Sequence, residues 1–192
     1  MADNLMRTFI SIPVPNEVKS KKNMLYSTLE NSPSNISWVK NEQLHLTLKF
    51  LGYTPEASFE NIKSVISKIA STINPFKLMI DKTGCFPTKE RPRVLWLGIN
   101  GNTTALNDLF LRIDKEMDKI GFPCLDKEFF PHITLARVKY PQKHTPDISV
   151  FLKSSYDPID FTADRVQFLS SELLPSGTFY TLLGSFPLGE SL

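Results

Sequence analysis

Cysteine is scarce in this chain of 192 residues, which contains only Cys85 and Cys124. The two lie far apart and in no spacing typical of a metal site, which argues against a disulfide-rich scaffold or a cysteine-based zinc site. Two isolated cysteines are typical of free thiols in a reducing compartment. We therefore expect a cytoplasmic protein.

A long apolar run is also missing. No stretch of the sequence approaches the roughly 20 apolar residues that a membrane-spanning helix requires. Asp3 comes early, and Pro13 and Pro15 interrupt the first apolar run, a pattern that does not match a signal peptide. The sequence thus predicts no membrane segment, in agreement with the expected cytoplasmic location.

Charge of one sign does not dominate. The formal net charge is +2 and the calculated pI is about 8.5. A balance this mild does not identify a nucleic-acid binder by charge alone. Basic side chains gather in 89–93 and in 137–143, but such clusters usually form a solvated surface. An anionic substrate is therefore compatible with the charge pattern without being established by it.

Histidine is the third scarce residue, and its placement is the most informative feature of the sequence. Two of the three histidines each begin a tetrad His-x-Thr-x inside a segment rich in β-formers. Because alternate side chains of a strand point to opposite faces, His45 points with Thr47 and His132 with Thr134. The opposite face of the first copy carries an apolar set suited to a core: Leu44, Leu46, Leu48 and Phe50. The polar pairs should therefore face a groove or solvent.

Periodicity along the chain predicts strands interspersed with helices. Apolar residues recur at helical spacing in 59–73 and 106–120, more weakly in 16–29, and 147–153 is a further short helical candidate. Strands are expected at 7–14, 36–39, 44–51, 76–80, 94–99, 133–140, 161–169 and 178–183, with turns at 32–35 and 175–177. Helices that separate runs of strands favour an α+β fold with antiparallel sheets.

The spacing of the tetrads suggests an internal duplication. Nearly half of the chain separates His45 from His132, and each tetrad strand lies near a long amphipathic helix. We interpret residues 1–192 as one domain of two duplicated, interleaved lobes. Each lobe would contribute one His-x-Thr strand to a shared central groove.

Two imidazoles that face one groove are suited to acid–base catalysis, because histidine titrates near neutral pH. A phosphate ester between them would use one neutral histidine to deprotonate water and one charged histidine to protonate the leaving oxygen. The threonine hydroxyl on the same face can donate to a non-bridging phosphate oxygen whose charge grows in the transition state. This chemistry requires no metal and no cofactor.

A zinc site is the alternative for the two histidines. Neither His45 nor His132 lies within metal-ligand spacing of another cysteine or histidine, which disfavours it. The third histidine, His144, lies in a proline-flanked segment, and we interpret it as a surface residue.

The residues together resemble the two-histidine (2H) phosphoesterases, in particular the RNA 2′,3′-cyclic phosphodiesterases, once called 2′-5′ RNA ligases. The resemblance spans nearly the whole chain. It rests on both tetrads with their flanks, LHLTLKFLG and PHITLARV, on the opening RTFI, and on the segments RPRVLWLGI and SSELLPSGTFYTLL. The tetrads alone are moderately specific, and the further segments strengthen the match.

The resemblance implies a bilobal α+β fold in which two antiparallel sheets related by a pseudo-twofold axis form a V-shaped groove, with helices on the outer faces. It implies metal-independent hydrolysis of 2′,3′-cyclic phosphate ends of RNA or nucleotides to 2′-phosphomonoesters, with reversible 2′-5′ ligation as an accompanying activity. His45 would be the proton donor to the 3′ oxygen and His132 the proton acceptor from water, while Thr47 and Thr134 hold the phosphate. No obligate protein partner is implied.

Two basic residues are further candidates for phosphate binding, and strand geometry treats them differently. The resemblance assigns a role to Arg137, yet in an unbroken strand Arg137 points away from His132 and Thr134. It reaches the groove only if the strand bulges or ends near Ala136. Lys49 lies on the same side of the strand as His45 and Thr47, so an unbroken strand would let it reach the phosphate or the RNA backbone, although we favour its interpretation as a solvated strand lysine.

A binding module is the alternative function. The same groove could hold a nucleotide or an RNA end without turnover. Both histidines and both threonines are intact, which favours the enzyme.

Overall fold

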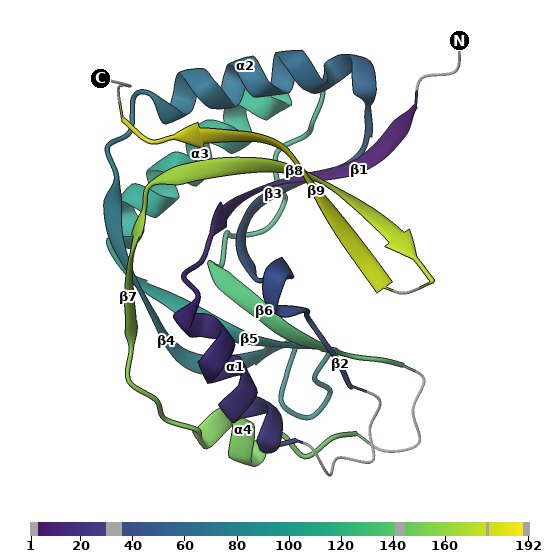
Figure 1. Ribbon diagram of the computed structural model, residues 1–192, viewed down its shortest axis with the longest axis vertical. Coiled ribbons are helices and arrows are strands. Elements are labelled where there is room, and N and C mark those ends of the chain that lie inside the picture. Colours follow the sequence, from purple (N-terminus) through teal and green to yellow (C-terminus); the bar gives the residue numbers. More distant parts are fainter. Residues whose placement is uncertain (1–3, 30–35, 141–144, 176, 190–192) are drawn as a thin grey trace.

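The computed structural model describes residues 4–29, 36–140, 145–175 and 177–189 (Figure 1). The turn predicted at 32–35, His144 and Ser176 of the second predicted turn lie outside this part of the chain. The strands are β1 (Leu5–Pro13), β2 (Ile36–Trp38), β3 (His45–Pro55), β4 (Phe76–Phe86), β5 (Val94–Gly101), β6 (His132–Val138), β7 (Ile159–Ala163), β8 (Arg165–Leu174) and β9 (Gly177–Pro187). The helices are α1 (Glu17–Ser27), α2 (Phe59–Ala70), α3 (Thr103–Asp118) and α4 (Ser149–Lys153), with 3-10 turns η1 (Asn41–Gln43) and η2 (Glu56–Ser58).

The described strands form one antiparallel sheet in the order β7-β4-β5-β6-β3-β1-β8-β9, with β2 beside β6. Its two parts are the β6 half (β7, β4, β5 and β6) and the β3 half (β3, β1, β8 and β9). Among the described residues, the halves are joined where Leu46 of β3 pairs with Ile133 of β6. The α+β class is confirmed, and the two expected sheets are the two halves of this continuous sheet.

The sheet curls into a half-barrel because two strands that adjoin in sequence belong to different halves. The single strand predicted at 161–169 is wrong: β7 ends at Ala163, Asp164 intervenes, and β8 begins at Arg165. β7 pairs with β4, whereas β8 pairs with β1. One linking residue can span this step only if the halves curve toward each other, and Figure 1 shows β7 running along one side between them.

The two long helices, α2 and α3, pack on the face of the β3 half that is opposite to the groove. α2 buries the apolar stripe predicted from its spacing, and Phe59 packs edge-on against Phe168 of β8, with ring centroids 5.4 Å apart. The predicted stripe extends to Ile73, which is buried in the turn beyond the helix. Asn102 caps the N-terminus of α3, and its side-chain oxygen accepts the Ala105 N–H at 3.1 Å. In Figure 1, α2 lies above the β3 half, α3 lies behind β8 and β9, and α1 and α4 lie in the lower part of the molecule.

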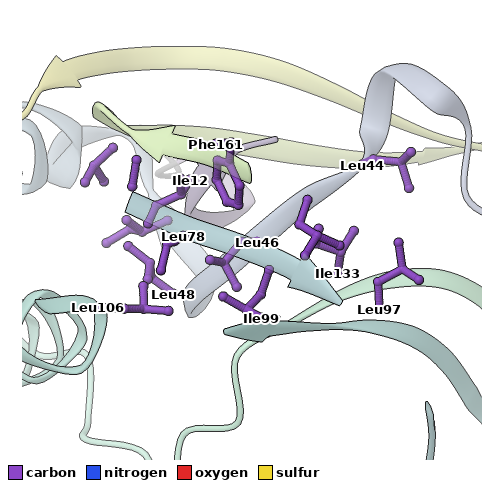
Figure 2. Close-up of a cluster of buried hydrophobic side chains, with 14 of the residues drawn as sticks. Ile12, Leu44, Leu46, Leu48, Leu78, Leu97, Ile99, Leu106, Ile133 and Phe161 are labelled. Atoms are coloured by element: carbon purple, nitrogen blue, oxygen red, sulfur yellow. The ribbon is translucent and has the colours of Figure 1, made fainter. Parts of the chain in front are cut away.

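A continuous hydrophobic core joins the two halves of the sheet. Leu46 and Ile133, which lie between the histidine and the threonine of each tetrad, are both fully buried in it. Figure 2 shows these two residues among core side chains of β1, β4, β5, α3 and β7. The histidine and threonine on either side of each must therefore point away from this core, as the parity of the tetrads predicts.

The alternation of side chains predicted for the residues after the first tetrad is wrong. The pairing of β3 with β1 slips between Ile10 and Ser11, which leaves Leu48 as an extra residue in a β-bulge. The bulge reverses the alternation, so Lys49 turns into the core and Phe50 turns outward. Lys49 is therefore excluded from the groove, although an unbroken strand would have placed it there.

Buried Lys49 forms an ion pair with Asp114 of α3 and donates to the carbonyl of Pro123 at 2.7 Å. Asp114 also accepts the Leu125 N–H at 3.3 Å. The pair thus connects β3 to α3 and to the segment that precedes β6.

Lys49→Met should destabilise the fold by about 3–5 kcal/mol, because it leaves the Asp114 carboxylate buried without its charge partner. The double variant Lys49→Met, Asp114→Asn should lose less than the single variant, since no unpaired charge remains. Urea unfolding at constant m value measures both.

The control is Lys63→Met, which removes a surface pair with Glu60 whose side chain is 86% exposed. Such a pair contributes less than about 1 kcal/mol. Equal losses for Lys49→Met and Lys63→Met would contradict the structural role of Lys49.

Candidate active site

A groove of about 590 Å³ runs between the two halves of the sheet. Both tetrads open into it: His45 and Thr47 from β3, and His132 and Thr134 from β6. Its remaining lining comes from other strands and from the segment that leads to β3: Arg7, Thr8, Phe9, Val39, Gln43, Phe50, Gly52, Val94, Arg137, Ser171, Thr178 and Tyr180.

The register of the junction places the four tetrad side chains next to one another. Leu46 and Ile133 are directly paired and antiparallel. Continuing that register by one residue sets His45 beside Thr134 and Thr47 beside His132, so each histidine is close to the threonine of the other tetrad. Adjacent side chains at paired positions have Cβ atoms about 4.5–5.5 Å apart. A phosphate-sized group in the groove can therefore contact both tetrads.

Each imidazole is held by the same backbone contact. His45 Nδ1 lies 2.7 Å from the carbonyl oxygen of Gln43, and His132 Nδ1 lies 2.8 Å from that of Phe130. A carbonyl oxygen can only accept, so Nδ1 carries the proton in both rings. Nε2 is then the atom of each histidine that gains or loses a proton, as an acid or a base in the groove requires.

The pKa values of both histidines are lowered, chiefly because burial disfavours the charged imidazolium. The carbonyl contact at Nδ1 opposes this shift, and the positive charge of Arg137 adds to it in both cases. A charged His132 further lowers the pKa of His45. The residues around the groove thus favour two neutral histidines, and an anion between them would raise both pKa values.

Arg137 points into the groove because β6 contains a bulge. Without one, Arg137 would point away from His132 and Thr134, as the sequence predicts. The pairing of β6 with β5 slips between Leu95 and Trp96, which leaves Leu135 as the extra residue. Ala136 then turns inward and Arg137 turns outward to line the groove. The bulge follows Thr134 just as the first bulge follows Thr47, so Arg137 and Phe50 occupy matching positions in the two tetrad strands.

Aromatic rings surround both histidines. Phe9 and Tyr180 lie against His45, with ring centroids 4.8 and 5.5 Å away. On the other side, Phe86 lies edge-on to His132 at 5.1 Å, and Trp96 packs against Phe86. These rings exclude water from the sides of the imidazoles, which accounts for the desolvation that lowers their pKa values.

Sequence reasoning missed several groove residues. Tyr180 of β9 lies opposite Ser171 of β8, and Ser171 lies opposite Arg7 of β1. Only this long-range register brings Tyr180 to His45, and no local pattern predicts it. The prediction that Phe50 faces the core is wrong, because Phe50 is 60% exposed and lines the groove.

The basic residues at 89–93 do not line the groove. Arg93 lies over the ring of Tyr140 at 4.3 Å and Arg91 at 5.6 Å, both as cation–π contacts. The Tyr140 hydroxyl donates to the carbonyl of Pro92 at 3.2 Å. These contacts fasten this segment to the chain just beyond β6.

Within the described residues, no group of three histidine, cysteine or acidic side chains could hold a metal ion. Cys85 and Cys124 are both free thiols. No helix of the described part of the chain is long and apolar enough to cross a bilayer.

Comparison with known proteins adds evidence along nearly the whole chain. The sequence model described as LigT like Phosphoesterase matches twice, at residues 12–96 and 97–180. A relative from Thermotoga maritima, named RNA 2′,3′-cyclic phosphodiesterase, is 35% identical over 93% of each chain. One of the same name from Methanothermobacter thermautotrophicus is 30% identical over 95% of this chain and 99% of its own length.

Solved structures share the fold. A crystal structure of a Thermus thermophilus protein has a TM-score of 0.79 and 29% identity, covering 97% of this chain and all of the other. E. coli LigT, crystallised with 3′-AMP, has a TM-score of 0.75 at 22% identity, covering 96% and 99% of the two chains. By sequence and by fold, the chain therefore belongs to the LigT-like phosphoesterase family.

Proposed function

We propose that this protein hydrolyses 2′,3′-cyclic phosphate ends of RNA to 2′-phosphomonoesters, without a metal ion. The observation that carries the proposal is the paired geometry of His45 and His132, each fixed through Nδ1 and facing one groove. The names of the relatives support the same substrate class. Ligation in the reverse direction stays a prediction, as does the cytoplasmic location.

In the proposed reaction, Nε2 of His132 takes a proton from water as its oxygen bonds to phosphorus. The bond between phosphorus and the 3′ oxygen breaks, and Nε2 of His45 gives its proton to that oxygen. The 2′ ester bond remains, so the product carries a 2′-phosphate and a free 3′-hydroxyl. The assignment of donor and acceptor follows the family resemblance, and the matching Nδ1 contacts suit either ring to either role.

The substrate itself supplies the charge that the acid needs. Burial and, to a smaller extent, Arg137 lower the pKa of His45 and so favour its neutral form before a phosphate binds. A phosphodiester anion beside the imidazole favours the charged form and raises its pKa. Binding of the substrate thus prepares His45 as the donor.

Thr47, Thr134 and Arg137 would hold the phosphate. The threonine hydroxyls can donate to non-bridging oxygens, whose charge grows as water attacks. Arg137 adds the positive charge at one end of this arrangement, where the matching position in β3 holds the uncharged ring of Phe50. We further propose that the two halves descend from a duplication within one domain, as the double match of the family sequence model supports.

His45→Ala and His132→Ala should each lower kcat by about 10²- to 10⁴-fold on an oligonucleotide with a 2′,3′-cyclic phosphate end. The double variant should lose little more than either single variant, because one partner does little without the other. Assays run in EDTA with the fold checked by circular dichroism, and His144→Ala serves as the control. Near-normal turnover by either single variant would disprove the pair and favour the binding-module alternative.

Thr47→Val and Thr134→Val should lower kcat about 5- to 150-fold, the effect of losing a hydrogen bond worth roughly 1–3 kcal/mol. KM should change less, because the bonds strengthen in the transition state. Valine keeps the shape and strand propensity of threonine. The matched control is Thr162→Val, at an exposed position of β7, and unchanged kcat in both tetrad variants would assign the threonines a structural role only.

Arg137→Gln should move the pH profile of kcat/KM to higher pH while lowering its maximum. Arg137 lowers the pKa of both histidines, so its removal raises both. The alkaline limb, where the donor His45 loses its proton, and the acid limb, where the acceptor His132 gains one, then both shift upward. Arg112→Gln, which removes an exposed cation of α3, should leave the limbs in place; a profile that moves to lower pH in Arg137→Gln contradicts this reasoning.

A further inference from the structure

A second bulge in β3 changes what the groove contains beyond the histidines. The pairing of β3 with β1 slips again between Thr8 and Phe9, which leaves Leu51 as the extra residue. Gly52 follows with φ of 76°, a left-handed conformation that other residues rarely adopt. Because of this second bulge, Tyr53 points to the groove face. Without it, alternation after Phe50 would point Tyr53 to the opposite face.

Tyr53 is the first member of a row that crosses the β3 half. It lies opposite Arg7 of β1, Arg7 lies opposite Ser171 of β8, and Ser171 lies opposite Tyr180 of β9. Directly paired residues share a face of the sheet. Arg7, Ser171 and Tyr180 line the groove, so Tyr53 extends the same surface, with 72% of its side chain exposed.

Tyr180, at one end of this row, lies against His45, whereas Tyr53, at the other end, lies beyond the phosphate position. Thr47 lies opposite Ser11, and Tyr53 lies opposite Arg7, four residues further along β1. At about 3.3 Å per residue along the strand, the positions of Tyr53 and Arg7 are about 13 Å from the position of Thr47. Phe50 lies opposite Phe9 between the two positions. The groove face of the β3 half therefore offers an aromatic ring and a cation at a distance suited to a second nucleotide.

The proposed reaction directs the rest of the RNA toward this row. Attacking and leaving oxygens lie roughly in line in phosphoryl transfer. With water at His132 and the 3′ oxygen at His45, the ribose of the terminal nucleotide lies on the side of the β3 half. The chain that continues from its 5′ oxygen must then leave along the same half, where β1, β8 and β9 lie next to one another (Figure 1).

Among the described residues, Arg7 forms no ion pair within the chain, and its guanidinium is close enough to Tyr180 to lower the pKa of that phenol, against the raising effect of burial. A phosphodiester that links the last two nucleotides would complement this cation. The exposed ring of Tyr53 can stack on a base of any identity, because each base has a π-face.

We propose that Arg7 and Tyr53 form a subsite for the penultimate nucleotide of the RNA, so that the substrate is an oligonucleotide rather than a mononucleotide. The proposal rests on the proposed function for its direction. Arg7 contacts the phosphodiester before the terminal nucleotide, and Tyr53 stacks on the base beyond it.

The test compares adenosine 2′,3′-cyclic phosphate with the adenine dinucleotide that ends in the same cyclic phosphate. Tyr53→Ala should lower kcat/KM for the dinucleotide about 5- to 150-fold, the range found for loss of base stacking. It should leave kcat/KM for the mononucleotide within about twofold. Tyr53→Phe should restore the dinucleotide value. Arg7→Gln should weaken the dinucleotide preference and flatten its salt dependence by about one phosphate contact.

Leu111→Ala, at an exposed position on α3, is the surface control. Affinities for the 2′-phosphate products, adenosine 2′-phosphate and its dinucleotide counterpart, form a second arm that needs no turnover. Loss of dinucleotide affinity in Tyr53→Ala supports the subsite even if neither substrate is hydrolysed, an outcome that would overturn the proposed function alone. Equal effects of Tyr53→Ala on both lengths, or none on either, would overturn the subsite.

Discussion

The pairing of Leu46 with Ile133 is the contact on which the rest of the site depends. Both residues are fully buried, and at their junction the two halves of the sheet become one. Because strand side chains alternate, fixing these two residues inward fixes His45, Thr47, His132 and Thr134 outward, on adjoining strands. The core thus holds the four polar groups in place, and the curl imposed by the β7–β8 connection gives them a groove instead of a flat surface.

Bulges then decide which residues join the tetrads. One bulge follows each tetrad threonine, and the residues it redirects differ between the strands. In β6 the redirected residue is Arg137, which brings a cation to the phosphate; in β3 it is Phe50, and the cation Lys49 is turned inward to Asp114. Two nearly symmetric strands thereby contribute different residues at matching positions, an arginine from β6 and a phenylalanine from β3. That asymmetry suits a substrate with an anionic phosphate at one end and a nucleoside at the other.

How far the sequence predicts this structure depends on whether the pattern is local. Alternation within His45–Leu48 and helical spacing in α2 and α3 are local, and each places its residues correctly. The alternation fails at Lys49 and Phe50 because one extra residue inverts the positions up to the second bulge, and nothing in the run of β-formers marks it. The sequence does indicate a bulge before Arg137, because the family resemblance places Arg137 in the groove whereas an unbroken strand would point it away. Tyr180 and Tyr53 could not be assigned, because both depend on the register of strands distant in sequence.

The central claim is that two histidines open the cyclic phosphate with a defined direction, with water on the side of His132 and the 3′ oxygen leaving at His45. The most direct measurement is the position of the phosphate in the product, formed in ¹⁸O-labelled water and in EDTA from an oligonucleotide with a 2′,3′-cyclic phosphate end. The account predicts a single product, a 2′-phosphomonoester that carries one ¹⁸O atom. A 3′-phosphomonoester, a mixture of both isomers, or loss of the reaction in EDTA would contradict it.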